Sequence, residues 1–224
     1  MKYVFFAILM GSAQLALAQM EYTPGNFDEV SITGDIQVTL KPSEEEKVII
    51  ETYGIPEDEV NVYVRAQTLK VSIINSLFKD NEEVRATVYY KKLRSIRANA
   101  GAQVSATTVI EGDYLEAQAT SGGVLELEVK VNKLESNATE GAILRLRGTA
   151  ESQKARATTG GELQAFDLAC ENAYARAGTG GIVEIAVSEN LDAYANLGGV
   201  IKYKGDPALK GSRKFLGGEV RRVN

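Results

Sequence analysis

A glycine followed by a second small residue recurs seven times between residues 101 and 218, at intervals of 18 to 21 residues. The pairs are Gly101-Ala102, Gly122-Gly123, Gly141-Ala142, Gly160-Gly161, Gly180-Gly181, Gly198-Gly199 and Gly217-Gly218. A regular period in this range is typical of stacked-coil architectures, in which each repeat buries its apolar face only against its neighbours. This period constrains the fold of more than half the chain.

The residue types around each glycine predict which side chains point inward. The third residue before it is small in all but the last copy: Ala98, Ala119, Ala138, Ala157, Ala177, Ala195 and finally Lys214. The third residue after it is apolar throughout: Val104, Leu125, Leu144, Leu163, Val183, Ile201 and Val220. Because side chains two apart on a strand share a face, we expect two short strands joined at each glycine, one with a narrow inner face and one with a bulky inner face.

These patterns predict an all-β fold: a single-stranded, parallel, right-handed β-helix (β-solenoid) of about seven coils over residues 94–224. An antiparallel meander with glycine turns is the alternative, although strands in such folds recur about every 8–12 residues. Ahead of the repeats, residues 27–93 read as an N-terminal β-strand cap region, since an open solenoid end would expose core and strand edges. Its strand candidates are rich in Val, Ile, Thr and Tyr: Val30–Thr33, Ile36–Leu40, Lys47–Tyr53, Val60–Arg65, Leu69–Asn75 and Val84–Tyr90.

The N-terminus predicts export. A short charged start precedes a largely apolar run that ends in the small-x-small sequence Ala16-Leu17-Ala18. We therefore expect a signal peptide at residues 1–18, a mature N-terminal tail at 19–26 and no transmembrane segment after cleavage. The lone Cys170 cannot form an internal disulfide, and we expect it to be buried. The expected location is the periplasm or the cell surface of a Gram-negative bacterium, or the extracellular space.

Composition excludes several classes of function. The net charge of −5 argues against a nucleic-acid partner. The absence of histidine removes Ser-His and Cys-His nucleophiles and the commonest zinc ligand. We predict no catalytic residues, no cofactor and no metal. A polysaccharide lyase or hydrolase is the competing hypothesis, with Glu162, Asp167, Glu171 and Arg176 as candidates, but the short, regular turns leave no loops to build a groove.

The outward positions are where binding residues are expected. Four residues before each glycine stand Arg97, Gln118, Asn137, Arg156, Arg176, Tyr194 and Arg213. Stacked coils would align them as a polar ladder able to bind a glycan or a protein. An ordinary solvated β face has the same composition, and that interpretation stays open, as does a structural envelope protein that assembles with itself. On the other side of each glycine, Glu126 with Arg145, Glu128 with Arg147 and Glu184 with Lys202 are predicted cross-coil ion pairs.

Three short motifs carry a resemblance to a known family. They are Phe-Asp-x-Val-x-Ile-x-Gly at residues 27–34, Leu-x-Val-x-Ile at residues 69–73, and Leu-Arg-Ser-Ile at residues 93–96, leading into the repeats. Over residues 27–222 the chain resembles the bacterial putative auto-transporter adhesin, head GIN domain family. That resemblance implies an extended β-helical domain outside the cytoplasm with a non-catalytic, adhesive role, and it carries over no catalytic residues.

Overall fold

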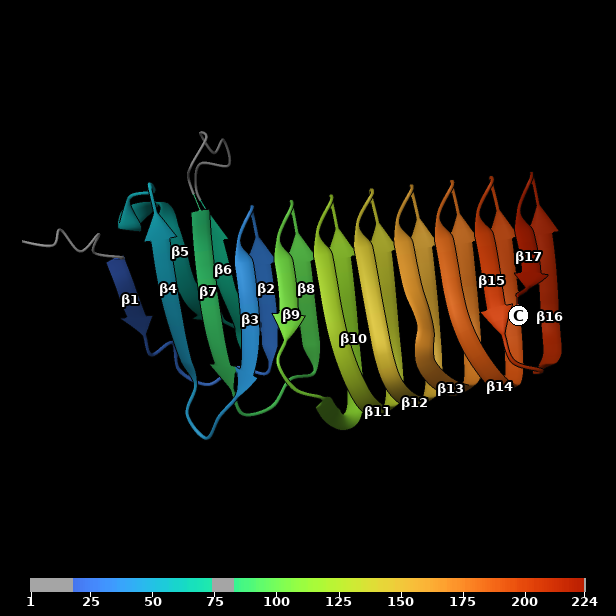
Figure 1. The fold of residues 1–224 in the computed structure, drawn as a ribbon, viewed down its shortest axis with the longest axis horizontal. Helices are drawn as coiled ribbons and strands as arrows, with labels where there is room; N and C mark the ends of the chain where they lie inside the picture. The colour runs from blue at the N-terminus through green and yellow to red at the C-terminus, as the bar shows by residue number, and fades with distance from the viewer. Residues whose placement is uncertain (1–17, 74–82, 224) are drawn as a thin grey trace, which may run out of the picture.

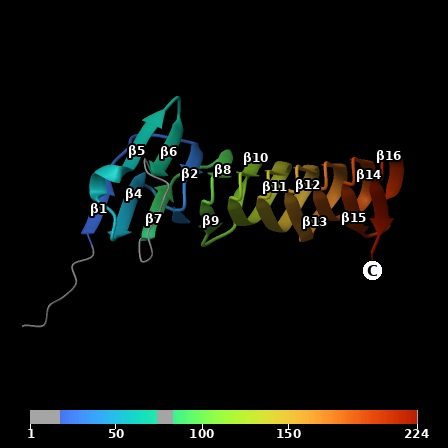
Figure 2. The same cartoon turned by 90° about the horizontal axis from the view of Figure 1, so that it is seen from above.

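The computed structural model describes residues 18–73 and 83–223, which form one 17-stranded sheet wound into an elongated solenoid (Figure 1). Seen from above, the coils follow one another along a single axis (Figure 2). Except for Ala18, the predicted signal peptide lies outside the described residues, as do the last two residues of the strand predicted at Leu69–Asn75. In the described ranges no helix is long and apolar enough to cross a membrane.

The repeats form parallel coils, which confirms the predicted solenoid of about seven turns. Four long strands make the central coils: β11 (Val124–Thr139), β12 (Ile143–Thr158), β13 (Glu162–Gly178) and β14 (Ile182–Asn196). They are preceded by β8 (Ser95–Asn99), β9 (Gln103–Ala106) and β10 (Ile110–Thr120), and followed by β15 (Val200–Lys204), β16 (Ala208–Phe215) and β17 (Glu219–Arg222). Each long strand curves from one glycine turn to the next, so the two short strands expected between successive turns are continuous here.

Each glycine pair lies in a tight turn whose two central residues have positive φ. At the turn between β12 and β13, Thr159 has φ 51° and Gly160 has φ 72°, and the Gly161 N–H donates to Thr158 O at 2.9 Å. This is the type I′ geometry, which favours glycine because a Cβ is strained there. The Gly160 N–H also donates to Thr179 O in the next coil at 3.1 Å, so hydrogen bonds run from turn to turn along the stack.

The core lies between the two walls of each coil, with the predicted inward residues at its centre. The alanines of the strand before each turn are fully buried: Ala98, Ala119, Ala138, Ala157, Ala177 and Ala195. Opposite them Leu125, Leu144 and Leu163 are fully buried as well. The narrow alanine face lets the larger leucine face fill the space between the walls, as close packing requires. In the last coil Lys214 occupies the alanine position and is exposed.

The six strands expected before the repeats are all present, and within the described ranges their bounds agree with the predicted ones to within two residues. They are β2 (Glu29–Thr33), β3 (Gln37–Pro42), β4 (Lys47–Tyr53), β5 (Val60–Arg65), β6 (Thr68–Ile73) and β7 (Glu83–Tyr90). A single 3-10 turn, Glu57–Glu59, precedes β5.

The spatial order of these strands differs from their order in the chain. β2 pairs in parallel with both β6 and β8, and β3 pairs in parallel with both β7 and β9, so the β2–β3 coil is inserted between two later ones. Beyond them β4 pairs antiparallel with β7, and β5 antiparallel with β6. A further strand, β1 (Ala18–Tyr22), pairs antiparallel with β4 inside the segment expected to be a tail. Antiparallel strands therefore end the parallel stack on its N-terminal side (Figure 1).

Candidate functional site

The wall formed by the strand segments before each tight turn carries the predicted ladder; we call it the outer wall. Cross-strand register places its residues opposite one another in the order Arg97, Gln118, Asn137, Arg156, Arg176, Tyr194 and Arg213. All seven side chains are half-buried or exposed, since they alternate with the buried alanines. The structure thus brings the seven residues into one row along the solenoid axis.

At its N-terminal end the row is occupied by an ion-pair network. The Arg97 guanidinium contacts Glu29 at 3.2 Å and Glu116 at 2.9 Å, and the Gln118 amide donates to Glu116 at 2.6 Å. Arg94 contacts Glu29 at 2.8 Å. Partial burial raises the pKa of Glu29, but hydrogen bonds from Thr68 and Arg97 and the charges of both arginines outweigh it, so this pKa lies below its ordinary value. Arg97 therefore acts in holding the inserted coil in place.

The C-terminal part of the row is different. In the described part of the chain, Arg156, Arg176 and Arg213 form no ion pair. Arg176 lies directly opposite Arg156 on one side and Tyr194 on the other. Its guanidinium carbon is 5.3 Å from the centre of the Tyr194 ring, a cation–π distance. This end presents unneutralised positive charge beside aromatic rings.

Three shallow hollows adjoin one another on the outer wall. One of about 670 Å³ lies between Tyr114 and Asp192 and includes Lys154, Arg156 and Tyr174. A second, of about 220 Å³, is lined by Tyr174, Arg176, Asp192, Tyr194 and Arg213. A third, of about 130 Å³, shares Lys154 and Arg156 with the first and includes Asn137, whose buried Oδ1 has no hydrogen-bond partner among the described residues. Because the hollows share residues, they form one continuous uneven surface.

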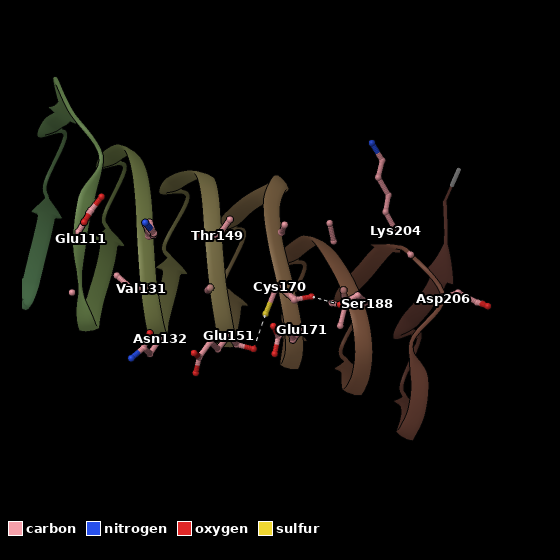
Figure 3. Close-up of a pocket in the computed structure, with 17 residues that line it drawn as sticks. Glu111, Val131, Asn132, Thr149, Glu151, Cys170, Glu171, Ser188, Lys204 and Asp206 are labelled. Carbon is pink, nitrogen blue, oxygen red and sulfur yellow. Dashed lines mark hydrogen bonds between the residues drawn. The ribbon is translucent and has the colours of Figure 1, made fainter.

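A trough of about 780 Å³ runs along the edge of the solenoid where the long strands bend, opposite the edge that carries the glycine turns (Figure 3). Its floor contains buried, mainly apolar residues in register, Val131, Ala150, Cys170 and Val187. Charged residues line its rims: Glu111, Lys130, Glu151, Glu171, Lys204 and Asp206. This trough was not predicted from the sequence because the bend residues differ in type from coil to coil. The signal that marks the bends is a break in the alternation of buried and exposed positions, which recurs near residues 131–134, 150–153, 170–173 and 187–191.

Cys170 lies in the trough floor and is buried, as predicted. Burial raises the pKa of its thiol to about 11. The thiol also lies 3.0 Å from Asn172 O, to which it donates a hydrogen bond. A thiol that stays protonated at neutral pH is a poor nucleophile, so Cys170 acts as a packing residue.

The wall after each turn shows two of the three ion pairs expected from the sequence. Glu126 contacts Arg145, and Glu184 contacts Lys202 at 2.9 Å. Glu128 lies opposite Arg147 in register, but within residues 18–73 and 83–223 the two form no ion pair. An exposed pair such as Glu126 with Arg145 contributes about 0.2–1 kcal/mol.

The residues considered for an enzymatic site are dispersed. Glu162 begins β13 after the turn, Glu171 lines the trough, and Arg176 lies on the outer wall. Across the described ranges there is no group of three or more His, Cys, Asp or Glu side chains able to hold a metal ion. The arrangement can bind a ligand through hydrogen bonds, charge and aromatic contact.

Comparison with solved structures shows the same architecture in other bacteria. A putative adhesin from Bacteroides fragilis has a TM-score of 0.80 and 22% identity over 94% of this chain and 98% of its own. A putative adhesin from Parabacteroides merdae has a TM-score of 0.73 and 23% identity over 93% and 96%. A putative lipid binding protein from Parabacteroides distasonis has a TM-score of 0.66 and 17% identity over 92% and 96%. At these identities the likeness establishes the fold alone.

No curated protein matches the chain. The family model described as "Putative auto-transporter adhesin, head GIN domain" matches residues 26–207, which is most of the solenoid together with the strands before it. This chain therefore belongs to the putative auto-transporter adhesin, head GIN domain family.

Proposed function

We propose that the protein is an exported, non-catalytic binding module of the bacterial cell envelope that recognises a glycan or a protein through its outer wall. The observation that carries this proposal is the row formed by Arg156, Arg176, Tyr194 and Arg213, which combines an aromatic ring with guanidinium groups that form no ion pair within the described ranges. Arginine and tyrosine are enriched where proteins contact partners. The adhesin description of the family supports the same role.

The disposition of carboxylates on the outer wall supports a non-catalytic role. Glu116 and Glu135 lie on neighbouring coils, but Glu116 is held by Arg97 at 2.9 Å and Glu135 by Lys154 at 3.2 Å. Asp192 lies three coils beyond Glu135, about 14 Å away at the usual strand spacing. Glycosidases need two free carboxyl groups within about 5–9.5 Å.

The test is to incubate the purified mature chain with a panel of polysaccharides and envelope or host proteins. Retention and polymer length are measured in the same samples. Retention with intact polymer supports the proposal, shortened polymer replaces it with an enzyme, and no retention of any polymer or protein overturns it. Tyr194→Ala should weaken retention at least fivefold, whereas Tyr53→Ala, an exposed tyrosine of β4 on the other wall, should change it less than twofold.

Export is the part of the proposal that rests on the N-terminal sequence. Cleavage after Ala18 would leave Gln19–Tyr22 free to keep their pairing with β4. N-terminal sequencing of the chain recovered from the periplasm, the cell surface or the medium should begin at Gln19. A full-length chain confined to the cytoplasm would contradict export.

A second candidate function is supported by the trough. Its apolar floor and charged rims suit an amphiphile, and one structural neighbour is called a putative lipid binding protein. A fluorescent fatty acid should bind the wild-type chain, and Ala169→Arg, which places a charge in the trough, should abolish binding. Gln103→Arg, at an exposed position of β9, is the matched control. Equal binding by both variants would rule the trough out.

A further inference from the structure

We infer that the C-terminal half of the outer wall binds an acidic polysaccharide, whose carboxylates pair with Arg156, Arg176 and Arg213 while its sugar rings contact Tyr174 and Tyr194. This inference rests on the proposed binding function and narrows its ligand to one chemical class. It also divides the ladder into a structural half that ends near Arg97 and a ligand-binding half.

Two arginines of the row, Arg156 and Arg176, face each other with like charge. Arg156 and Arg176 lie directly opposite on neighbouring strands, about 4.8 Å apart at the backbone. Like charges at such positions are destabilising. On the wall after the turns, Lys202 and Arg221 are also directly opposite, but each contacts a carboxylate, Glu184 at 2.9 Å and Glu219 at 3.0 Å. A like-charge contact that has no carboxylate partner among the described residues is typical of a functional site, and a bound anion would relieve it.

The surface around the three arginines carries further positive charge. Lys133 and Lys154 lie on the same wall, within the largest hollow. The acidic residues beside them are Glu135, which contacts Lys154 at 3.2 Å, and Asp192. The surface around the three arginines therefore remains positive in a chain whose net charge is −5. Guanidinium groups bind carboxylates through two parallel hydrogen bonds, which makes arginine better suited than lysine to this contact.

The tyrosines beside the arginine row favour a sugar over an acidic polypeptide as the ligand. Tyr174 is 40% exposed and shares a hollow with Tyr194, so both ring systems border the arginine row. A sugar ring can lie on an aromatic face while its hydroxyl groups donate to Asp192. An acidic peptide has no comparable series of hydroxyl donors to offer that carboxylate. Aromatic faces with one free acceptor therefore favour a glycan.

The length of the arginine row favours a polymer over a single sugar. From Arg156 to Arg213 it crosses three coil spacings, about 14 Å along the axis at the usual strand separation. A single monosaccharide cannot contact all three arginines, whereas a polymer lying along the solenoid can. The ligand is accordingly a chain with repeated negative charge.

The experiment compares three probes on the full mature chain: polygalacturonate, the same polymer with its carboxyl groups reduced to alcohols, and poly-L-glutamate. We expect polygalacturonate to bind at least tenfold more tightly than either of the others. Arg176→Gln and Arg213→Gln should each weaken that binding at least fivefold, and Arg176→Lys should restore only part of it. Arg147→Gln is the matched control: it removes an exposed arginine from the other wall and should change binding less than twofold.

Each contrary result has a definite meaning. Equal binding of the reduced polymer would leave the binding function standing but overturn the acidic ligand. Tighter binding of poly-L-glutamate would replace the glycan with an acidic protein. An equal loss in Arg147→Gln and Arg176→Gln would show that net charge, and no site, is responsible. If all three probes fail while another polymer is retained in the panel, this inference is wrong and the proposed function survives; if nothing is retained, both fail.

Discussion

Ala157 shows how closely the two walls approach at a single position. It is fully buried, and it faces the interior between the alanines of the adjacent coils. Ala157→Leu should lower the free energy of unfolding by about 1–3 kcal/mol, because a well-packed interior has no room for three more carbon atoms. Thermal unfolding followed by circular dichroism measures the change. Thr158→Leu, at the neighbouring outward position, is the control, and an unchanged melting midpoint for Ala157→Leu would contradict the inward assignment.

The tight turns hold residues other than glycine in a left-handed conformation. Thr159 is exposed and β-branched, yet its φ is 51°. That conformation costs a residue with a Cβ about 1–2 kcal/mol, and asparagine tolerates it better. Thr159→Asn should therefore raise the melting midpoint by about 2–4 °C, the shift that 1 kcal/mol produces in a chain of this size. Gly160→Ala should lower it, and the opposite order of the two variants would show that the turn is not type I′ in solution.

The inserted coil is joined to its neighbours partly through Glu29. Because the pKa of Glu29 is lowered in the folded chain, folding favours the charged carboxylate. The stabilisation is complete above the ordinary glutamate pKa of about 4.3 and is lost as the pH falls through the lower, folded value. Glu29→Gln should lower the melting midpoint by about 2–4 °C at pH 7, and this difference should shrink below pH 4.

A matched control for Glu29 is Glu219→Gln in the last strand. Glu219 contacts Arg221 at 3.0 Å in an exposed pair, and such pairs are worth little. The melting midpoint of the Glu219→Gln variant should follow that of the wild-type chain across the pH range. A gap between Glu29→Gln and the wild type that stays constant down to pH 3 would mean that packing, and not charge, is responsible.

The strands were predictable because their signals are local. Alternation of apolar and polar residues located β2 to β7 within two residues over the described ranges, and the glycine period located the coils after residue 94. The insertion of β2–β3 between β6–β7 and β8–β9 was not predictable, because the strands fit both their neighbours equally well and no spacing in the sequence records which coils are adjacent. Strand β1 was missed because five residues outside the repeats carry too little pattern.

The ladder was predictable as a row, but its division was not. Arg97 and Arg176 occupy equivalent positions in the repeat, so a pattern treats them alike. They differ because Arg97 lies beside Glu29, which is 68 residues away in sequence and reaches it only through the inserted coil. Partners that far apart decide which arginines are neutralised, and that information is present only in the folded chain.

The stack itself should tolerate a change in length, because each coil contacts mainly its two neighbours. The parallel register sets Ile143 opposite Glu162 and Thr158 opposite Gly178. A second copy of residues 143–161, inserted after Gly161, would therefore present the same inward residues to the coils on both sides. We expect a folded chain whose melting midpoint stays within a few degrees of the parent and whose length grows by about 4.8 Å, the spacing of paired strands, as measured by small-angle X-ray scattering.

Half a coil should behave differently. Duplicating only residues 143–151 would leave the inserted strand ending at the bend, so every later residue would be displaced to the wrong wall and the alanine face would meet solvent. We expect that variant to lose its cooperative unfolding transition. The shorter insertion is expected to be the more destructive one, so added chain length cannot explain the contrast between them. If both are equally destructive, the coils do not act as interchangeable units, and the narrow-and-bulky packing derived from the glycine period does not by itself determine the fold.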